Sequence, residues 1–139
     1  IDAPLSLPFA YFGKGHDYFY RQCDRAVRAM SPMFIGGLTA RAIKLKSVLL
    51  KDHPDLTFHE TYPGYLAREV LDLRDKYNKK SKAIEPFLKA LEEYLPLEYV
   101  NPPANWHQVD AVLAWLSGYR HMQGSNISVG DEAEGLIII

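Results

Sequence analysis

The sequence predicts a mixed α/β domain whose sheet has a parallel component. Short apolar segments typical of strands occur at the start of the chain, just before Pro63 and at residues 136–139. The segments between them repeat apolar residues at three- and four-residue spacing, which is the period of an amphipathic helix. Strands that alternate with helices favour parallel pairing. Three strands make a small sheet for this many helices, which suggests that strands are missing or are supplied by another chain.

The composition is typical of one globular domain, so we expect residues 1–139 to form a single domain. Hydrophobic residues make up 47% of the chain and charged residues 24%, a balance that can build a core. The net charge is −1, so overall charge does not indicate a nucleic-acid partner. One cysteine excludes an intramolecular disulfide, and no apolar run approaches the roughly 20 residues of a membrane span. We expect a cytoplasmic protein without a membrane partner.

The first part of the chain is expected to contain a strand end, a loop and two helices. Residues 1–7 are apolar and interrupted by proline, as at the end of a buried strand. Residues 9–18 are rich in aromatic residues and glycine and are typical of a loop over a site. Residues 17–30 have helical spacing, and a second helix is expected after Gly36-Gly37. The apolar stripe of that second helix consists of Leu38, Ala42, Leu45 and Leu49.

The second part is expected to contain two strands and three helices. Residues 56–61 predict a strand that ends at a proline-glycine pair. Helical periodicity follows at residues 65–77 and again, after a polar stretch, at residues 84–95. A long helix is expected at residues 105–122. The β-branched run at residues 136–139 predicts the last strand.

Four side chains are candidates for a catalytic or metal site. Asp2 and Glu60 lie at the ends of predicted strands, and the carboxyl ends of parallel strands form ligand sites at one edge of a sheet. His107 and Asp110 are three residues apart and share one face of the last long helix. Structural explanations stay open for each acid: a turn before proline for Asp2, a cap or solvent contact for Glu60, and the helix dipole for Asp110.

These residue types favour Mg²⁺ or Mn²⁺ over zinc. Carboxylates are hard oxygen ligands, and a histidine adds a borderline ligand. The single cysteine and the scattered histidines have no zinc-ligand spacing. Paired divalent ions activate water and stabilise the leaving oxygen in phosphodiester hydrolysis.

Charged residues form two further clusters. Arg21, Asp24, Arg25 and Arg28 lie on one predicted helix, where they form either a surface charge lattice or a clamp for phosphate facing the 9–18 loop. A basic cluster follows, either a solvated helix surface or a contact for nucleic acid. Its members are Arg41, Lys44, Lys46 and Lys51.

Six short motifs follow one another along nearly the whole chain. They are IDAPLSLP at residues 1–8, RQCDR at 21–25, FIGGLT at 34–39, HETYP at 59–63, VDAVLA at 109–114 and GDEAEGLI at 130–137. In this order they resemble the predicted RNase H-like nucleases, a bacterial and archaeal group catalogued as a domain of unknown function.

The resemblance implies an RNase H-like fold with a two-metal site. In such folds, acids on the first strand, the fourth strand and the last helix bind two Mg²⁺ or Mn²⁺ ions. Asp2 matches the acid of the fourth strand and Asp110 the acid of the last helix. Glu60 matches a family acid at the end of the fifth strand, and His107 lies where related enzymes often have another ligand. Arg21, with Asp24, would contact phosphate.

The chain departs from the family at its beginning. The family starts with three antiparallel strands and a helix, and its first strand bears an essential aspartate; none of this precedes Ile1. We therefore expect an N-terminally incomplete RNase H-like domain that is inactive by itself. Three hypotheses follow: a metal-dependent nuclease, a non-catalytic binding or assembly module, and a homo-oligomer that covers an open sheet edge.

Overall fold

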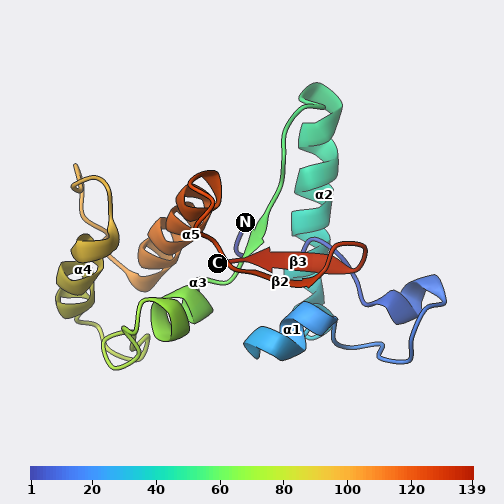
Figure 1. The fold of residues 1–139 in the computed structure, drawn as a ribbon, viewed down its shortest axis with the longest axis horizontal. Helices are drawn as coiled ribbons and strands as arrows, with labels where there is room; N and C mark the ends of the chain where they lie inside the picture. Colours follow the sequence, from blue (N-terminus) through green and yellow to red (C-terminus); the bar gives the residue numbers. More distant parts are fainter. The chain divides into compact units, whose positions relative to one another are not determined.

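The chain folds into a mixed α/β structure with about 45% helix and a small three-stranded sheet. The computed structural model describes residues 1–139 (Figure 1). The chain forms two compact units. Unit 1 consists of Ile1–Tyr62 and Ile127–Ile138, and unit 2 of Pro63–Asn126 with Ile139. The prediction of a mixed α/β structure is confirmed, whereas the RNase H-like fold and the single domain stay predictions.

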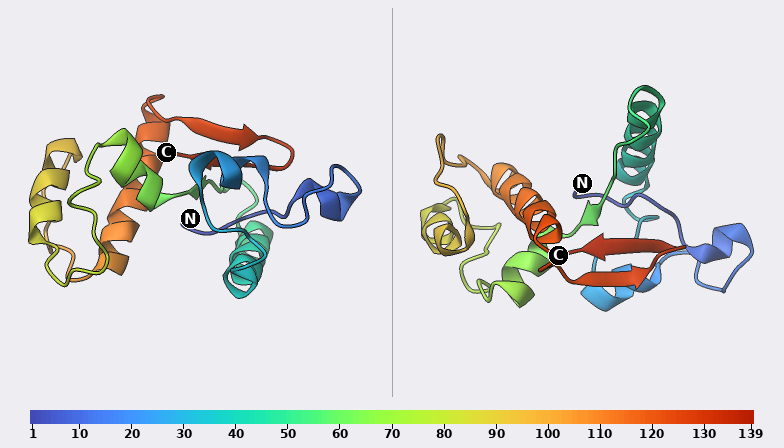
Figure 2. Two further views of the ribbon diagram at one scale, coloured as in Figure 1. Left: turned by 90° about the horizontal axis from the view of Figure 1, so that it is seen from below. Right: turned by 45° about the horizontal axis from the view of Figure 1, so that its top comes forward.

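The sheet belongs to unit 1 and has a parallel and an antiparallel half. Its strands are β1 (Glu60–Thr61), β2 (Ser128–Asp131) and β3 (Gly135–Ile138), in the order β1-β3-β2. β1 runs parallel to β3, which confirms the parallel component. β2 and β3 form an antiparallel hairpin (Figure 2). β2 was not predicted because it is mostly exposed and lacks an apolar pattern.

The start of the chain is extended without being a strand. Ile1 lies beside β1, and its carbonyl oxygen accepts a hydrogen bond from the N–H of Thr61 at 2.9 Å. Pro4 has no N–H to continue such a ladder. The predicted strand at residues 1–7 is therefore wrong as a strand, and only its pairing with the β1 segment is present.

Three helical elements complete unit 1. They are η1 (Phe9–Phe12), a short 3₁₀ helix inside the expected loop, α1 (Gln22–Val27) and α2 (Gly36–Asp52). α2 was predicted from its periodicity, and α1 packs against β2 and β3. Most of the predicted apolar stripe of α2 is not buried: Ala42 is buried, but Leu38 and Leu45 are exposed because nothing in unit 1 covers that face.

The predicted helix at residues 17–30 is shortened to α1 at both ends. At its beginning, the Asp17 carboxylate accepts hydrogen bonds from the N–H groups of Phe19 and Tyr20, which forms a local turn in place of a helical one. At its end, Arg28 adopts a left-handed conformation with φ of 53°, which stops the helix. Apolar spacing alone could not show either boundary.

Unit 2 is helical. Its elements are α3 (Pro63–Tyr65), the π-helical turn η2 (Leu66–Val70), α4 (Glu85–Leu91), the 3₁₀ turn η3 (Glu92–Tyr94) and α5 (Trp106–Met122). α5 was predicted correctly, and the side chain of its N-cap residue Asn105 accepts the N–H of Gln108 at 3.0 Å. The predicted helix at 65–77 stops early because Asp72 is left-handed, with φ of 55°.

Each unit has its own buried apolar side chains. In unit 1 they come mainly from α1 and β3, and in unit 2 from η2, α4 and α5. None of the helices has the length and apolar character that crossing a membrane requires.

Candidate functional site

A buried cluster of three charged side chains lies beside the sheet in unit 1. Arg21 is fully buried and lies between the carboxylates of Asp24 and Glu60, which are 1% and 6% exposed. Its Nη2 donates to Asp24 Oδ1 and to Glu60 Oε1, both at 2.6 Å. Its Nε donates to Asp24 Oδ2 at 3.0 Å, and its Nη1 donates to Glu60 Oε2 at 2.7 Å. Each carboxylate thus forms a bidentate ion pair with the same guanidinium.

All five N–H donors of the Arg21 guanidinium form hydrogen bonds. Its fifth N–H bond goes from Nη1 to the hydroxyl oxygen of Ser6 at 2.9 Å, and an arginine has five such donors. The predicted contact between Arg21 and phosphate would require one of these bonds to be given up. That role stays a prediction, as does the one for Asp24, whose Oδ2 also accepts the backbone N–H of Arg21 at 2.9 Å.

The cluster fixes the first residues of the chain against β1. Glu60 Oε2 accepts the backbone N–H of Leu5 at 3.0 Å, and Ser6 is held by Arg21 as described above. On the other side, the carbonyl of Ile1 accepts the N–H of Thr61. The segment that contains Asp2 is therefore held on both sides of that residue.

Asp2, Asp24 and Glu60 line one cavity of about 150 Å³ in unit 1. The rest of its lining is mostly apolar and includes Met30, Ile35 just before α2, and Leu38 of α2. Asp24 and Glu60 are buried and bonded to Arg21, whereas Asp2 is exposed. Asp2 is thus the carboxylate of this cavity that solvent reaches. Its place in the same lining as Glu60 agrees with the predicted proximity of these two residues.

Burial and the neighbouring carboxylates shift the pKa of Arg21 in opposite directions. Burial alone would lower the pKa of Arg21, but the hydrogen bonds to Glu60 and Asp24 outweigh it, so the pKa lies above its usual value. Burial also raises the pKa of the neighbouring Cys23 thiol to about 12. Arg21 is therefore charged at every ordinary pH, and Cys23 is a protonated core side chain.

Two glycines of the hairpin allow its backbone to approach this cluster. Gly135 has φ of +151°, and a Cβ there would lie 2.4 Å from Ser6 Oγ and 3.0 Å from Arg21 Nη1. Gly130 has φ of +119°, and a Cβ there would lie 2.7 Å from Cys23 Cβ. Only glycine combines these dihedrals with this proximity.

Glu134 has a structural role that sequence reasoning missed. It is buried, and its Oε1 accepts the N–H of Phe9 at 2.8 Å while its Oε2 accepts the N–H of Gln22 at 2.8 Å. It therefore ties the hairpin turn to the starts of η1 and α1. In the sequence it belongs to an acidic stretch, Asp131-Glu132-Ala133-Glu134, which has the composition of an exposed turn, so no local signal distinguished it.

The remaining predicted residues lie in unit 2. Asp110 is 8% exposed; its Oδ1 accepts the hydroxyl of Tyr77 at 2.5 Å and its Oδ2 accepts the ammonium of Lys79 at 2.5 Å. Tyr77 packs against Phe87 and Trp106. His107 is exposed, one turn before Asp110. Asp110 is thus held by a tyrosine and a lysine, two partners that the sequence did not indicate.

The structure has no ready-made metal cage. No group of three or more His, Cys, Asp or Glu side chains within residues 1–139 is arranged to hold a metal ion. Asp2 and Glu60 belong to unit 1, whereas His107 and Asp110 belong to unit 2. A metal site shared by Asp2, Asp110 and His107 stays a prediction.

Comparison with known proteins adds no relative. No family model, no curated protein and no solved structure matches the chain.

Proposed function

We propose that this chain is a metal-dependent nuclease with an RNase H-like fold, which hydrolyses phosphodiester bonds with Mg²⁺ or Mn²⁺. The six ordered motifs and the mixed α/β structure support the proposal. The observation that carries it is the position of Asp2, an exposed carboxylate on a firmly held segment at a cavity.

The buried cluster accounts for that position. Glu60 and Arg21 bond to Leu5 and Ser6, just after Asp2 in the chain. A charged ligand on a segment fixed in this way loses little conformational freedom when it binds a cation or positions a substrate. In this proposal Arg21 and Glu60 are positioning residues for Asp2, and neither needs to contact the substrate.

Mg²⁺ suits a site of this kind. It commonly binds through one or two carboxylates and completes its shell with water and substrate phosphates, without an all-protein cage. Asp2 would be the ligand from unit 1, and the phosphodiester would supply further oxygens. When bound, the ion would neutralise charge on the phosphate and lower the pKa of a bound water.

Asp110 and His107, both in unit 2, are the other metal ligands predicted from the sequence. The Asp110 carboxylate now accepts the Lys79 ammonium and the Tyr77 hydroxyl. The Lys79 side chain is half exposed, so breaking its ion pair with Asp110 should cost little free energy. A metal ligand role for Asp110 requires that Lys79 gives up this contact.

The test is Mn²⁺ binding by calorimetry, with and without an oligonucleotide, for the wild type and for Asp2→Asn. The substitution should abolish Mn²⁺ binding and any metal-dependent cleavage while leaving the urea midpoint close to that of the wild type, because Asp2 is exposed. Asp55→Asn, an exposed acid of unit 1 outside the cavity, is the matched control and should retain Mn²⁺ binding. If Asp2→Asn binds Mn²⁺ as the wild type does, the proposal fails.

The alternative is a binding or assembly module in which the same acids are structural. The start of the chain lies along β1, whereas β2 is an edge strand of the sheet, and an open edge can pair with another chain. Light scattering tests the assembly hypothesis, and a monomer at all protein concentrations would contradict it.

A further inference from the structure

Unit 1 exposes an unusual number of aromatic side chains in one stretch of the chain. Between 46% and 66% of each side chain is accessible. These residues, which we call the aromatic surface, are Tyr11, Phe12, Tyr18, Phe19 and Phe34. Single exposed apolar residues are ordinary, but a contiguous group of large ones marks an interaction site.

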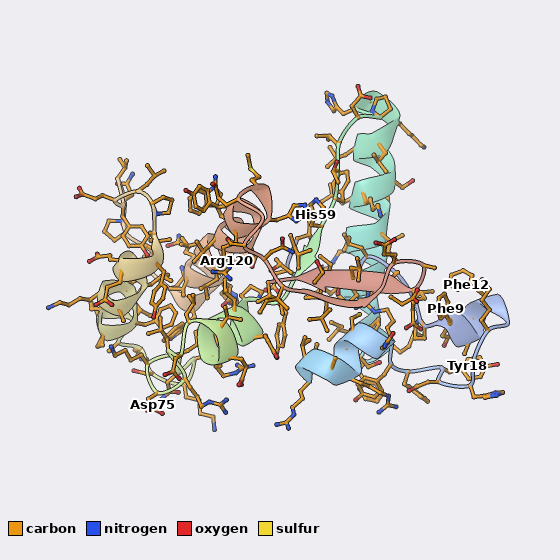
Figure 3. All side chains as sticks on the ribbon, viewed as in Figure 1. Phe9, Phe12, Tyr18, His59, Asp75 and Arg120 are labelled. Atoms are coloured by element: carbon orange, nitrogen blue, oxygen red, sulfur yellow. The ribbon has the colours of Figure 1, made fainter.

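The rings are arranged in two neighbouring groups. Tyr11 and Tyr18 meet edge to face, with centroids 5.5 Å apart, and Figure 3 shows Tyr18 near Phe9 and Phe12 around η1. In the second group Phe34 lies 5.6 Å from Phe19. Phe34 also lies 6.0 Å from Tyr20, and Phe12 and Phe34 are the most exposed members of the aromatic surface, at 66% and 64%.

Cations are interleaved with the rings. The Lys14 ammonium lies 5.6 Å from the centroid of Phe9, and the Arg25 guanidinium lies 4.6 Å from the centroid of Tyr20. Arg28 is exposed at the end of α1. The acid within residues 9–20 is Asp17, which already pairs with Arg25 and accepts two backbone N–H groups. Lys14 and Arg28 are therefore the cations of this stretch that an anionic partner can contact, while the exposed acids Asp131 and Glu132 lie on the hairpin turn that Glu134 ties to the start of η1.

Hydrogen bonds set the shape of this surface in advance. Glu134 accepts the N–H of Phe9 at the start of the stretch. Asp17 closes the turn before Phe19, and the hydroxyl of Ser31 donates to the carbonyl of Phe19 at 2.5 Å. A backbone that is held in place before binding loses little conformational freedom when a ligand stacks on the rings that it bears.

We propose that the aromatic surface binds single-stranded nucleic acid by stacking its bases on exposed rings while Lys14 and Arg28 contact its phosphates. Proteins that hold single strands combine these two features, aromatic platforms and a cationic track. A duplex hides the faces of its bases and offers only phosphates and groove edges, so it cannot use the rings. The inference rests on the proposed function, since it names the substrate class, but the binding it describes needs no metal.

The experiment measures the affinity of the whole chain for a fluorescently labelled single-stranded oligonucleotide by anisotropy, in a buffer with a metal chelator. Phe12→Ala and Phe34→Ala should each weaken binding by about 5- to 150-fold, the range measured for loss of one stacked base. Phe12→Tyr should retain affinity because it keeps the ring. Phe12→Leu should lose affinity, although it keeps an apolar side chain, because it has no aromatic face.

Three comparisons separate stacking from other causes. Leu97→Ala removes an equally exposed apolar side chain from unit 2 and should leave the affinity unchanged. The duplex of the same sequence and heparin, a polyanion without bases, should bind clearly more weakly than the single strand. Because the chelator removes the metal, binding in this buffer reports on the aromatic surface alone, so that failure of the metal site and failure of this surface are distinguishable.

Several results would overturn the inference. Equal affinity for the single strand, the duplex and heparin would show attraction by charge alone. Unchanged binding in Phe12→Ala and Phe34→Ala would exclude the rings. Concentration-dependent dimers that Phe12→Ala abolishes, without oligonucleotide binding by the wild type, would assign the surface to a second copy of the chain.

Discussion

Removal of the Arg21 guanidinium is expected to destabilise unit 1 strongly. Arg21→Met keeps a long apolar stem but leaves the carboxylates of Asp24 and Glu60 buried without a cation. Breaking a buried ion pair by removing one partner costs about 3–5 kcal/mol. Here one cation serves two carboxylates through four hydrogen bonds, so the cost should lie at or above the upper end of that range. We therefore expect Arg21→Met to lose about 5 kcal/mol at pH 7.

Urea unfolding followed by far-UV circular dichroism measures this loss. Trp106 and Trp115 both lie in unit 2, so tryptophan fluorescence reports that unit separately and serves as an internal reference. The triple variant Arg21→Met with Asp24→Asn and Glu60→Gln removes all three charges and should regain part of the stability at pH 7. A loss below about 1 kcal/mol at pH 7 would contradict this expectation, because it is the range of a solvent-exposed ion pair.

Three further predictions concern unit 1. Gly135→Ala should destabilise the protein by more than about 2 kcal/mol, because its Cβ would collide with the Ser6 hydroxyl, whereas Gly118→Ala, in a helix and with open space around it, should be neutral or stabilising in the same thermal unfolding assay. The Cys23 thiol, whose pKa burial raises to about 12, should not react with a thiol reagent until urea unfolds unit 1; a prompt native reaction would contradict its position in the core. Asp17 has a pKa lowered to about 2 by backbone N–H groups and an arginine, so its contribution to stability is complete above pH 4 and is lost as the pH falls towards 2. Asp17→Asn should remove that part of the acid sensitivity, and an unchanged acid-unfolding curve would contradict it.

The fold was predictable where local chemistry determines it. α2 and α5 have sustained helical periodicity, and α5 also has an asparagine cap, so both were located closely. The parallel pair β1–β3 followed from short apolar strands separated by helices. α1 was overestimated because apolar spacing continues through Met30, although the backbone reverses at Arg28. β2 is polar and exposed and acquires its structure from pairing with β3, which no local pattern shows.

The candidate site was predictable in its members but not in their bonds. Asp2, Arg21, Asp24 and Glu60 were all selected from the sequence, and the structure brings them to one cavity or one cluster. The contact between Arg21 and Glu60 joins residues 39 positions apart, so it depends on tertiary structure and cannot be read from spacing. Asp110 was selected as an acid on a helix, but its partner Tyr77 lies 33 positions away.

The order of the chain has a consequence for how the protein is made. β3 is the central strand of the sheet in unit 1, yet it follows all of residues 63–126 in the sequence. A ribosome therefore releases residues 1–62 long before β3 and Glu134 emerge to complete their unit. Until then the acids around Arg21 lack the hairpin that covers them, while unit 2 already has its helices. Early termination upstream of the hairpin would yield a chain with the helices of unit 2 and an incomplete unit 1 in which β1 lacks its partner strand, a species prone to aggregation and to proteolysis.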